Sequence, residues 1–365
     1  MKKVILCISA FLIFFMFAAY ASQADEQYEM SGADALEQYT FEAKKFDSEF
    51  SFRDTVKKFS QGGANFNPNE IIGNIFKLLL SEIYDNIAGI TGIAAAVFCL
   101  GIISCAGNEK FLDVTFYVCC VTVFSIGYKA VSEVLNVGIE AMEAMKVFMA
   151  AAVPVLGGLM AGAGGVSRCI LVSSSIVAIT GIIEVFINVL MPICTCMLML
   201  CGVNSLSAEF SLSELERSLQ KFVIWCIGII MVIFTGLLSI FALAAGCADN
   251  VLGKTAKFMA GSFIPIVGGV VSDTLDTVIA CSRLIKGAVG AGGVIAILYI
   301  SLVPLIKISA VLILYSLTSA LLAPVADKRI LRLTDGFSAV LRIMLAAVVS
   351  SAIMFIVCAG MIAAM

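Results

Sequence analysis

Two charged residues lie in strongly apolar parts of this sequence, where charged groups are costly and often functional. Glu184 lies within the apolar run 169–190, and Lys307 lies beside Pro304 between two late apolar runs. A charge at membrane depth is a candidate for contact with an ion, a partner or another buried charge. Glu184 and Lys307 could pair with each other, although Lys307 could also extend its long side chain to the membrane surface.

A second polar group directly follows a Pro-Gly-Gly sequence. Ser272, Asp273 and Asp276 form this group, and the two aspartates are three positions apart, so they share one face of a helix. They could contact a cation or a basic partner, or they could cap a helix or face water. A metal site of this type needs more oxygen ligands than these residues supply. We therefore expect no bound metal and no other cofactor.

The composition indicates a membrane protein. The chain is 61% hydrophobic and 13% charged, with a mean hydropathy of +1.06, whereas soluble domains are about 45–50% apolar and about 25% charged. The net charge of −3 argues against a nucleic-acid partner. The lack of histidine removes the commonest general base, so we expect no enzymatic activity. Most of the 13 cysteines lie in or beside apolar runs, which is typical of packing residues rather than of a disulfide framework.

The start of the chain has the pattern of a secretory signal peptide. Two lysines precede an apolar run that ends at Ala19-Tyr20-Ala21, a small-residue cleavage site, so we assign 1–21 to the signal peptide. A retained anchor helix is the alternative. The segment 22–86 is acidic and is expected outside the cytoplasm. Within it, Asn67-Pro68-Asn69-Glu70 has the order of a helix start, which predicts an amphipathic helix over 67–85.

The apolar runs predict an all-α polytopic fold. A helix needs about 20 mostly apolar residues to cross a bilayer, and eight runs approach this length. The first two form an N-terminal unit over 87–132. The eight runs are 87–106, 114–128, 169–190, 193–206, 222–246, 287–306, 308–325 and 340–361.

Four of the six prolines indicate an internal repeat. The stretch V-P-V-L-G-G-L contains Pro154, and I-P-I-V-G-G-V contains Pro265, 111 positions later. Pro192 follows the first by 38 residues, and Pro304 follows the second by 39. A duplication explains this spacing better than a chance likeness between apolar segments does.

The predicted copies are 133–246 and 247–365. Each contains three apolar runs. The late loop, which precedes the last run of each copy, is 208–221 in the first copy, where it is acidic, and 327–332 in the second copy, where it is basic. An odd number of crossings and opposite loop charges predict an inverted repeat, as in many transporters.

The two Pro-Gly-Gly segments are expected to enter the membrane and return as re-entrant loops or half-helices. Proline removes a backbone donor and glycine lets the chain turn, and such backbone must be buried or line a cavity. Close helix packing at these glycines is the alternative. The candidate pore or gate residues are Pro154, Gly157, Gly158, Pro265, Gly268 and Gly269.

The sequence around the second Pro-Gly-Gly segment resembles the stage III sporulation protein AE family. The likeness is most specific in G-S-F-I-P-I-V-G-G-V-V-S-D over 261–273 and in C-S-R-L-I-K over 281–286. The order of a signal peptide, an acidic segment and a polytopic body also agrees. The resemblance implies a protein of the mother-cell membrane that surrounds the forespore, and it implies no catalytic residues.

The resemblance also implies partners. These are other membrane and ring-forming proteins of a transenvelope channel, or feeding tube, including a secretion-type ATPase. We therefore expect a non-enzymatic, multi-pass subunit that contributes a pore or transporter-like element and sustains forespore development. The alternative is a non-conducting scaffold in the bilayer that docks the other components.

Overall fold

The computed structural model describes most of the membrane body and little of the N-terminal segment. The described residues are Leu36, Thr40, 51–52, 54–56, 68–106, 109–162, 166–206, 212–263, 268–324 and 326–364. Of the side chains in 242–287, which include the second Pro-Gly-Gly segment, nothing is described. The predicted signal peptide over 1–21 also lies outside the described residues.

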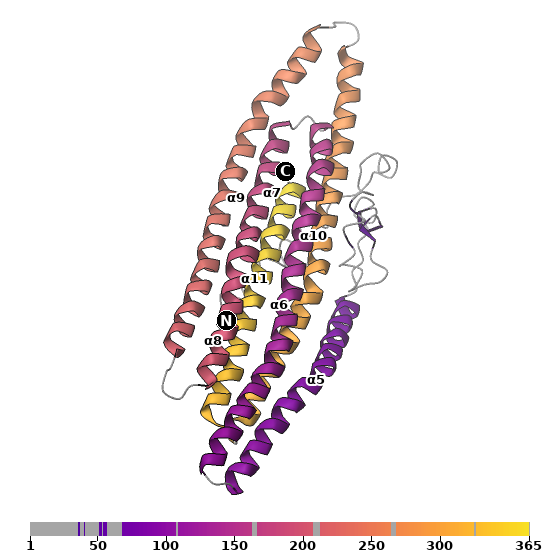
Figure 1. Cartoon of the computed structure of the whole chain (residues 1–365). Coiled ribbons are helices and arrows are strands. Elements are labelled where there is room, and N and C mark those ends of the chain that lie inside the picture. Colours follow the sequence, from indigo (N-terminus) through magenta and orange to yellow (C-terminus); the bar gives the residue numbers. More distant parts are fainter. Residues whose placement is uncertain are drawn as a thin grey trace.

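The chain forms an elongated bundle of long helices in which successive passes run antiparallel (Figure 1). This confirms the all-α class. The turn η2 is π-helical and joins α7 to α8 without a break, so these three elements make one pass. The elements are α5 (Pro68–Ala106), α6 (Glu109–Gly162), α7 (Val166–Val185), η2 (Phe186–Leu190), α8 (Met191–Leu206), α9 (Ser213–Phe263), α10 (Gly268–Leu322) and α11 (Lys328–Ala364).

Six helical stretches within the described ranges are long and apolar enough to cross a membrane. The predicted count of eight is not confirmed, because the runs 169–190 and 193–206 belong to one helical pass and the runs 287–306 and 308–325 belong to another. The six stretches are Gly73–Ile102, Val114–Val155, Val172–Leu206, Ser213–Phe241, Ala288–Leu322 and Lys328–Met361.

The continuity at Pro192 has a local cause. A proline inside a helix lacks an N–H and its ring clashes with the preceding turn. The turn before Pro192 is wider than an α-turn, since the Met191 N–H donates to the carbonyl oxygen of Phe186, five residues earlier. A π-turn of this kind absorbs the irregularity and lets the helix continue as α8.

The starts of α9 and α11 lie at the same end of the bundle, in the lower part of Figure 1. The Cys201 Sγ, near the end of α8, is 3.4 Å from the carbonyl oxygen of Leu333, near the start of α11. A Cβ added to Gly336 of α11 would come within 3.1 Å of the Glu216 Oε1 of α9. The starts of α9 and α11 are therefore neighbours.

This neighbourhood contradicts the predicted inversion of the repeat. An inverted repeat would place the two late loops at opposite ends of the bundle. The prediction counted three crossings between these loops, but the runs 287–306 and 308–325 form a single helix, which leaves two crossings, α9 and α10. An even number returns the chain to the same end. The duplication itself, with copies 133–246 and 247–365, stays a prediction.

The core is built around α11, which runs beside α6 in the same direction. Phe337 of α11 is the centre of a ring cluster, with its centroid 6.3 Å from that of Phe124 and 5.6 Å from that of Tyr315. The Phe337 ring occupies the space that a Cβ at Gly127 of α6 would need. This close approach fixes the face that α6 turns toward the core.

Candidate functional site

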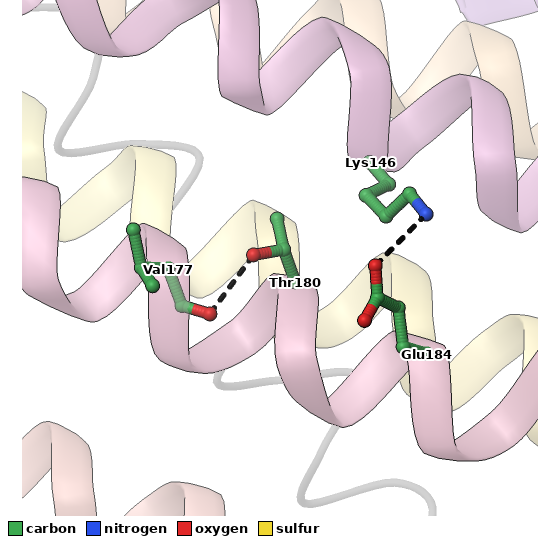
Figure 2. A network of polar contacts seen from close by, with 4 residues as sticks. All are labelled: Lys146, Val177, Thr180 and Glu184. Atoms are coloured by element: carbon green, nitrogen blue, oxygen red, sulfur yellow. Dashed lines mark hydrogen bonds and ion pairs between the residues drawn. The ribbon is translucent and has the colours of Figure 1, made fainter.

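Glu184 forms an ion pair between α6 and α7. Its Oε1 lies 3.4 Å from the Nζ of Lys146, and Figure 2 shows the lysine reaching across from α6. One turn earlier on α7, the Thr180 hydroxyl donates to the carbonyl oxygen of Val177. The Lys146 side chain is 25% exposed and that of Glu184 is 58% exposed, so the pair lies at the edge of the helix contact.

Lys307 has a different partner from the one that the sequence suggested. Its Nζ lies 3.8 Å from the Glu82 Oε2 of α5, and both side chains are partly buried. The suggested Glu184–Lys307 pair is therefore wrong. The two residues join α7 to α6 and α10 to α5, in two separate pairs.

The outward face of α6 carries a line of exposed polar side chains. They recur three or four positions apart, which places them on one side of the helix. The hydroxyls of Thr122 and Ser125 donate to carbonyl oxygens of their own helix. The glutamates of this face have no ion-pair partner among the described residues. We call this face the polar stripe of α6; it consists of Thr122, Ser125, Lys129, Glu133, Asn136, Glu140 and Glu143.

The polar stripe lies within the helical stretch Val114–Val155, which is apolar enough to cross a membrane. A bilayer covers about 20 residues of a helix. Wherever such a section is placed within this stretch, it includes at least two of the four charged residues of the stripe. The stripe therefore cannot lie wholly outside the hydrocarbon layer if α6 crosses through this stretch.

The first Pro-Gly-Gly segment is part of a continuous helix. Pro154 is exposed near the end of α6, Gly157 is half-buried, and the helix continues through Gly158 to Gly162. The segment itself contains no turn, because α6 continues to Gly162 before the antiparallel α7 begins at Val166. The predicted re-entry of this segment is therefore not confirmed.

The second Pro-Gly-Gly segment lies at the far end of the α9–α10 hairpin. Pro265 falls outside the described residues, whereas Gly268 and Gly269 begin α10. Figure 1 shows that α9 and α10 extend beyond the other helices at this end. The described part of this segment, Gly268 and Gly269, therefore lies in the hairpin rather than in α6. A gate formed by the two segments stays a prediction.

The remaining predicted polar residues lie on the first turns of α10. Ser272, Asp273 and Asp276 follow Gly269 in the same helix, but their side chains are not described. Within the described part of the chain, no group of three or more His, Cys, Asp or Glu side chains is placed to hold a metal ion. A role for these aspartates in binding a cation or a basic partner stays a prediction.

Comparison with known proteins identifies the family. The family model described as "Stage III sporulation protein AE" matches residues 50–365. The chain belongs to this family. A curated relative, the stage III sporulation protein AE of Bacillus subtilis (strain 168), is 26% identical over 311 residues, which cover 84% of this chain and 78% of the relative. No solved structure matches the chain.

The family match covers every residue of the ion pairs and of the polar stripe. The chain is thus a membrane protein of a sporulation family, as its apolar helices and this match together indicate. Sequence reasoning missed Lys146 and Glu82 as ion-pair partners, and it ended the second apolar run at residue 128, before most of the polar stripe. The three- and four-residue spacing of the polar residues in 122–143 was the signal that could have revealed a helical face.

Proposed function

We propose that this protein is a non-enzymatic membrane subunit of a transenvelope channel between mother cell and forespore. It lies in the mother-cell membrane around the forespore and assembles with other membrane and ring-forming proteins, including a secretion-type ATPase. Its contribution is a polar path along the outward face of α6. Membership of the stage III sporulation protein AE family supports the setting.

The observation that carries the conducting element is the polar stripe of α6. A charged side chain at the centre of a bilayer costs about 2.5–3.5 kcal/mol on insertion scales, and more by other estimates. At least two of the stripe's four charged residues lie within any bilayer-length section of Val114–Val155. Since lipid is a poor environment for them, the stripe faces water or a polar surface in the assembled complex. A water-filled path is the arrangement that solvates all of them.

The polar stripe replaces the Pro-Gly-Gly segments as the conducting element. The first of these segments continues a helix and the second lies at the far end of the α9–α10 hairpin. These positions do not support a shared gate, so we prefer the polar stripe.

A scaffold function is the second candidate, and the α9–α10 hairpin favours it. Helix α9 continues from Gly246, the end of its predicted apolar run, to Phe263, which is about 25 Å of helix. A hairpin of this length offers a surface for partner proteins beyond the membrane. In this reading the polar stripe is covered by a polar helix of a partner and conducts nothing.

The test replaces the three stripe glutamates together by glutamine, Glu133→Gln, Glu140→Gln and Glu143→Gln. Glutamine keeps the shape and removes the charge. If the stripe lines a path, the purified complex reconstituted in vesicles loses most of its conductance or changes its ion selectivity, while the complex still assembles. Glu214→Gln is the matched control, because that side chain is 84% exposed at the start of α9, away from the stripe. Unchanged conductance in the triple variant would refute the polar path.

A labelling experiment separates the two candidates. Asn136→Cys lies on the polar stripe, and Val177→Cys lies on an exposed apolar position of α7. A water-soluble maleimide labels position 136 in the assembled complex if the stripe faces water. Under the scaffold reading, position 136 is labelled in the isolated protein and protected in the complex. Position 177, which faces lipid in both cases, stays unlabelled; mass spectrometry separates these sites from the native cysteines.

A further inference from the structure

Part of the N-terminal segment is packed into the helix bundle. Leu36, Phe52 and Val56 are fully buried, although the surrounding sequence is acidic and polar. A helical turn positions the latter two, because the Thr55 N–H donates to the carbonyl oxygen of Ser51 and the Asp54 N–H donates to the Ser51 hydroxyl. Phe52 and Val56 are four positions apart and thus lie on one face of this turn.

The turn occupies a groove between α6, α10 and α11. The Phe52 ring meets that of Phe148 of α6 edge-on, with centroids 5.8 Å apart. Small residues line the rest of the groove, among them Ala152 of α6, Gly290 and Gly293 of α10, and Ala359 of α11. Small side chains on three neighbouring helices leave room for one aromatic and one branched side chain.

Gly292 of α10 makes the space for this turn alone. A Cβ built on Gly292 would lie 2.6 Å from the Val56 Cγ2 and 3.3 Å from the Phe52 Cε2. The three nearest atoms all belong to the N-terminal turn and none to another helix of the bundle. On the next residue, Gly293, a Cβ would meet only the Ala359 Cβ, at 3.9 Å, which is an ordinary contact. Among the described residues, the closest obstacles to a larger residue at 292 therefore come from the N-terminal turn.

We propose that this groove is a binding site for an apolar helical turn, and that its resident ligand is the chain's own turn at Phe52 and Val56, docked reversibly. The ligand class is an aromatic residue followed four positions later by a branched one. Of the described N-terminal residues, Leu36, Thr40 and the turn at 51–56 enter the bundle. Docking is reversible because this described part is short, while the helices pack on one another without it. The docked turn covers the place where α6, α10 and α11 meet.

The first test measures proximity in the full-length protein. Val56→Cys with Gly292→Cys places two sulfur atoms within disulfide reach, and Val56→Cys with Gly293→Cys is the register control. After mild oxidation in membranes, mass spectrometry of linked peptides should find at least about tenfold more 56–292 than 56–293 linkage. Equal yields for the two pairs would overturn the docking geometry.

The second test measures displacement, again with a neighbouring glycine as the control. Gly292→Ala adds a methyl group against the stiff Val56 side chain, so hydrogen exchange at the Thr55 amide should accelerate at least about tenfold, as expected for opening of a weakly held segment. Gly293→Ala should leave that exchange unchanged, and both variants should keep the exchange of α11 amides.

Equal exchange at Thr55 in the two variants would refute the role of Gly292. In the unmodified protein, a Thr55 amide that exchanges only as slowly as the α11 amides would refute reversible docking. Neither readout depends on conduction, so this inference can fail or succeed separately from the proposed function.

Discussion

Helices α6 and α11 lie side by side and run in the same direction, yet they use their surfaces differently. In the most apolar part of α11, 67% of the residues are buried inside the protein, compared with 28% for α6. The exposed positions of α11 in its second half are apolar, such as Val349, Ile353 and Val357. In α6, by contrast, the exposed positions from Thr122 to Glu143 form the polar stripe.

The difference shows that residues needed for stability and residues available for chemistry can lie on different helices or on different faces of one helix. Almost every side of α11 contacts another helix, so its residues must fit their neighbours. α6 contacts the core with one face, where Gly127 receives the Phe337 ring, and leaves the opposite face free of packing demands. Only that free face can hold several charged groups without disturbing the core. Substitutions in α11 should therefore affect stability, whereas substitutions in the polar stripe should affect function.

The largest expected effect concerns the direction of the helices. If α6 and α11 are parallel, reporter fusions at residues 215 and 330 must both report the same side of the membrane, since the starts of α9 and α11 are neighbours. Each fusion should be fully active with one reporter type and inactive with the other. Opposite results at the two positions would restore the inverted repeat and remove the basis of the comparison.

The next effect concerns the centre of the core. Phe337→Ala removes a fully buried ring that contacts both α6 and α10, and the cavity left behind should cost about 3–5 kcal/mol of stability. Denaturation of the purified protein in detergent measures this change. Val357→Ala, an exposed position on the same helix, is the control and should change stability little.

A smaller loss is expected where the two helices touch. Gly127→Ala places a methyl group where the Phe337 ring lies, and such overpacking typically costs about 1–3 kcal/mol. Gly181→Ala on α7 has no neighbouring atom within 4 Å, so it should be neutral or stabilise the helix by up to about 1 kcal/mol. If both variants unfold at the same denaturant concentration, the close α6–α11 approach is absent.

The ion pair between α6 and α7 should contribute less than either core position. Lys146→Met removes the partner of Glu184, whose side chain is 58% exposed, and pairs of this kind contribute at most about 1 kcal/mol. Lys129→Met removes an exposed lysine that has no carboxylate partner among the described residues, and it is the matched control. A stability loss at Lys146 as large as that of Phe337→Ala would place this pair in the core.

The smallest effect on stability is expected in the polar stripe. Glu140→Gln changes an exposed position without an ion-pair partner among the described side chains, so the stability of the isolated protein should change by no more than about 0.5 kcal/mol. Spore formation by a strain that carries this variant should nevertheless fall, and it should fall further with each additional stripe glutamate replaced. Normal spore counts with all three glutamates replaced would refute the view that the polar stripe of α6 serves function while α11 serves stability.

The sequence predicted the helical class and several helix positions well, because long apolar runs have few other stable arrangements in a membrane. The predicted runs 87–106, 222–246 and 340–361 all lie within single helices, α5, α9 and α11. The family was also evident from the residues around Pro265.

The errors arose where a local signal was treated as a boundary. Pro192 and Pro304 suggested breaks, but a π-turn accommodates the first and α10 continues through the second. The second predicted run ended at residue 128, where the charges begin, but Lys129 and the glutamates after it lie on one face of α6, which continues to Gly162. The partners of Glu184 and Lys307 depend on which helices are neighbours, and that arrangement is set by packing over the whole chain.

The length of α6 has a mechanical consequence. Its 54 residues form one helix of about 80 Å, more than twice the thickness of a bilayer's hydrocarbon core of about 30 Å. A helix of that length must emerge from the membrane on at least one side. Because hydrogen bonds join each turn to the next, a displacement along its axis at one end moves the other end by a similar amount. α6 is therefore a rigid connection between the two ends of the bundle.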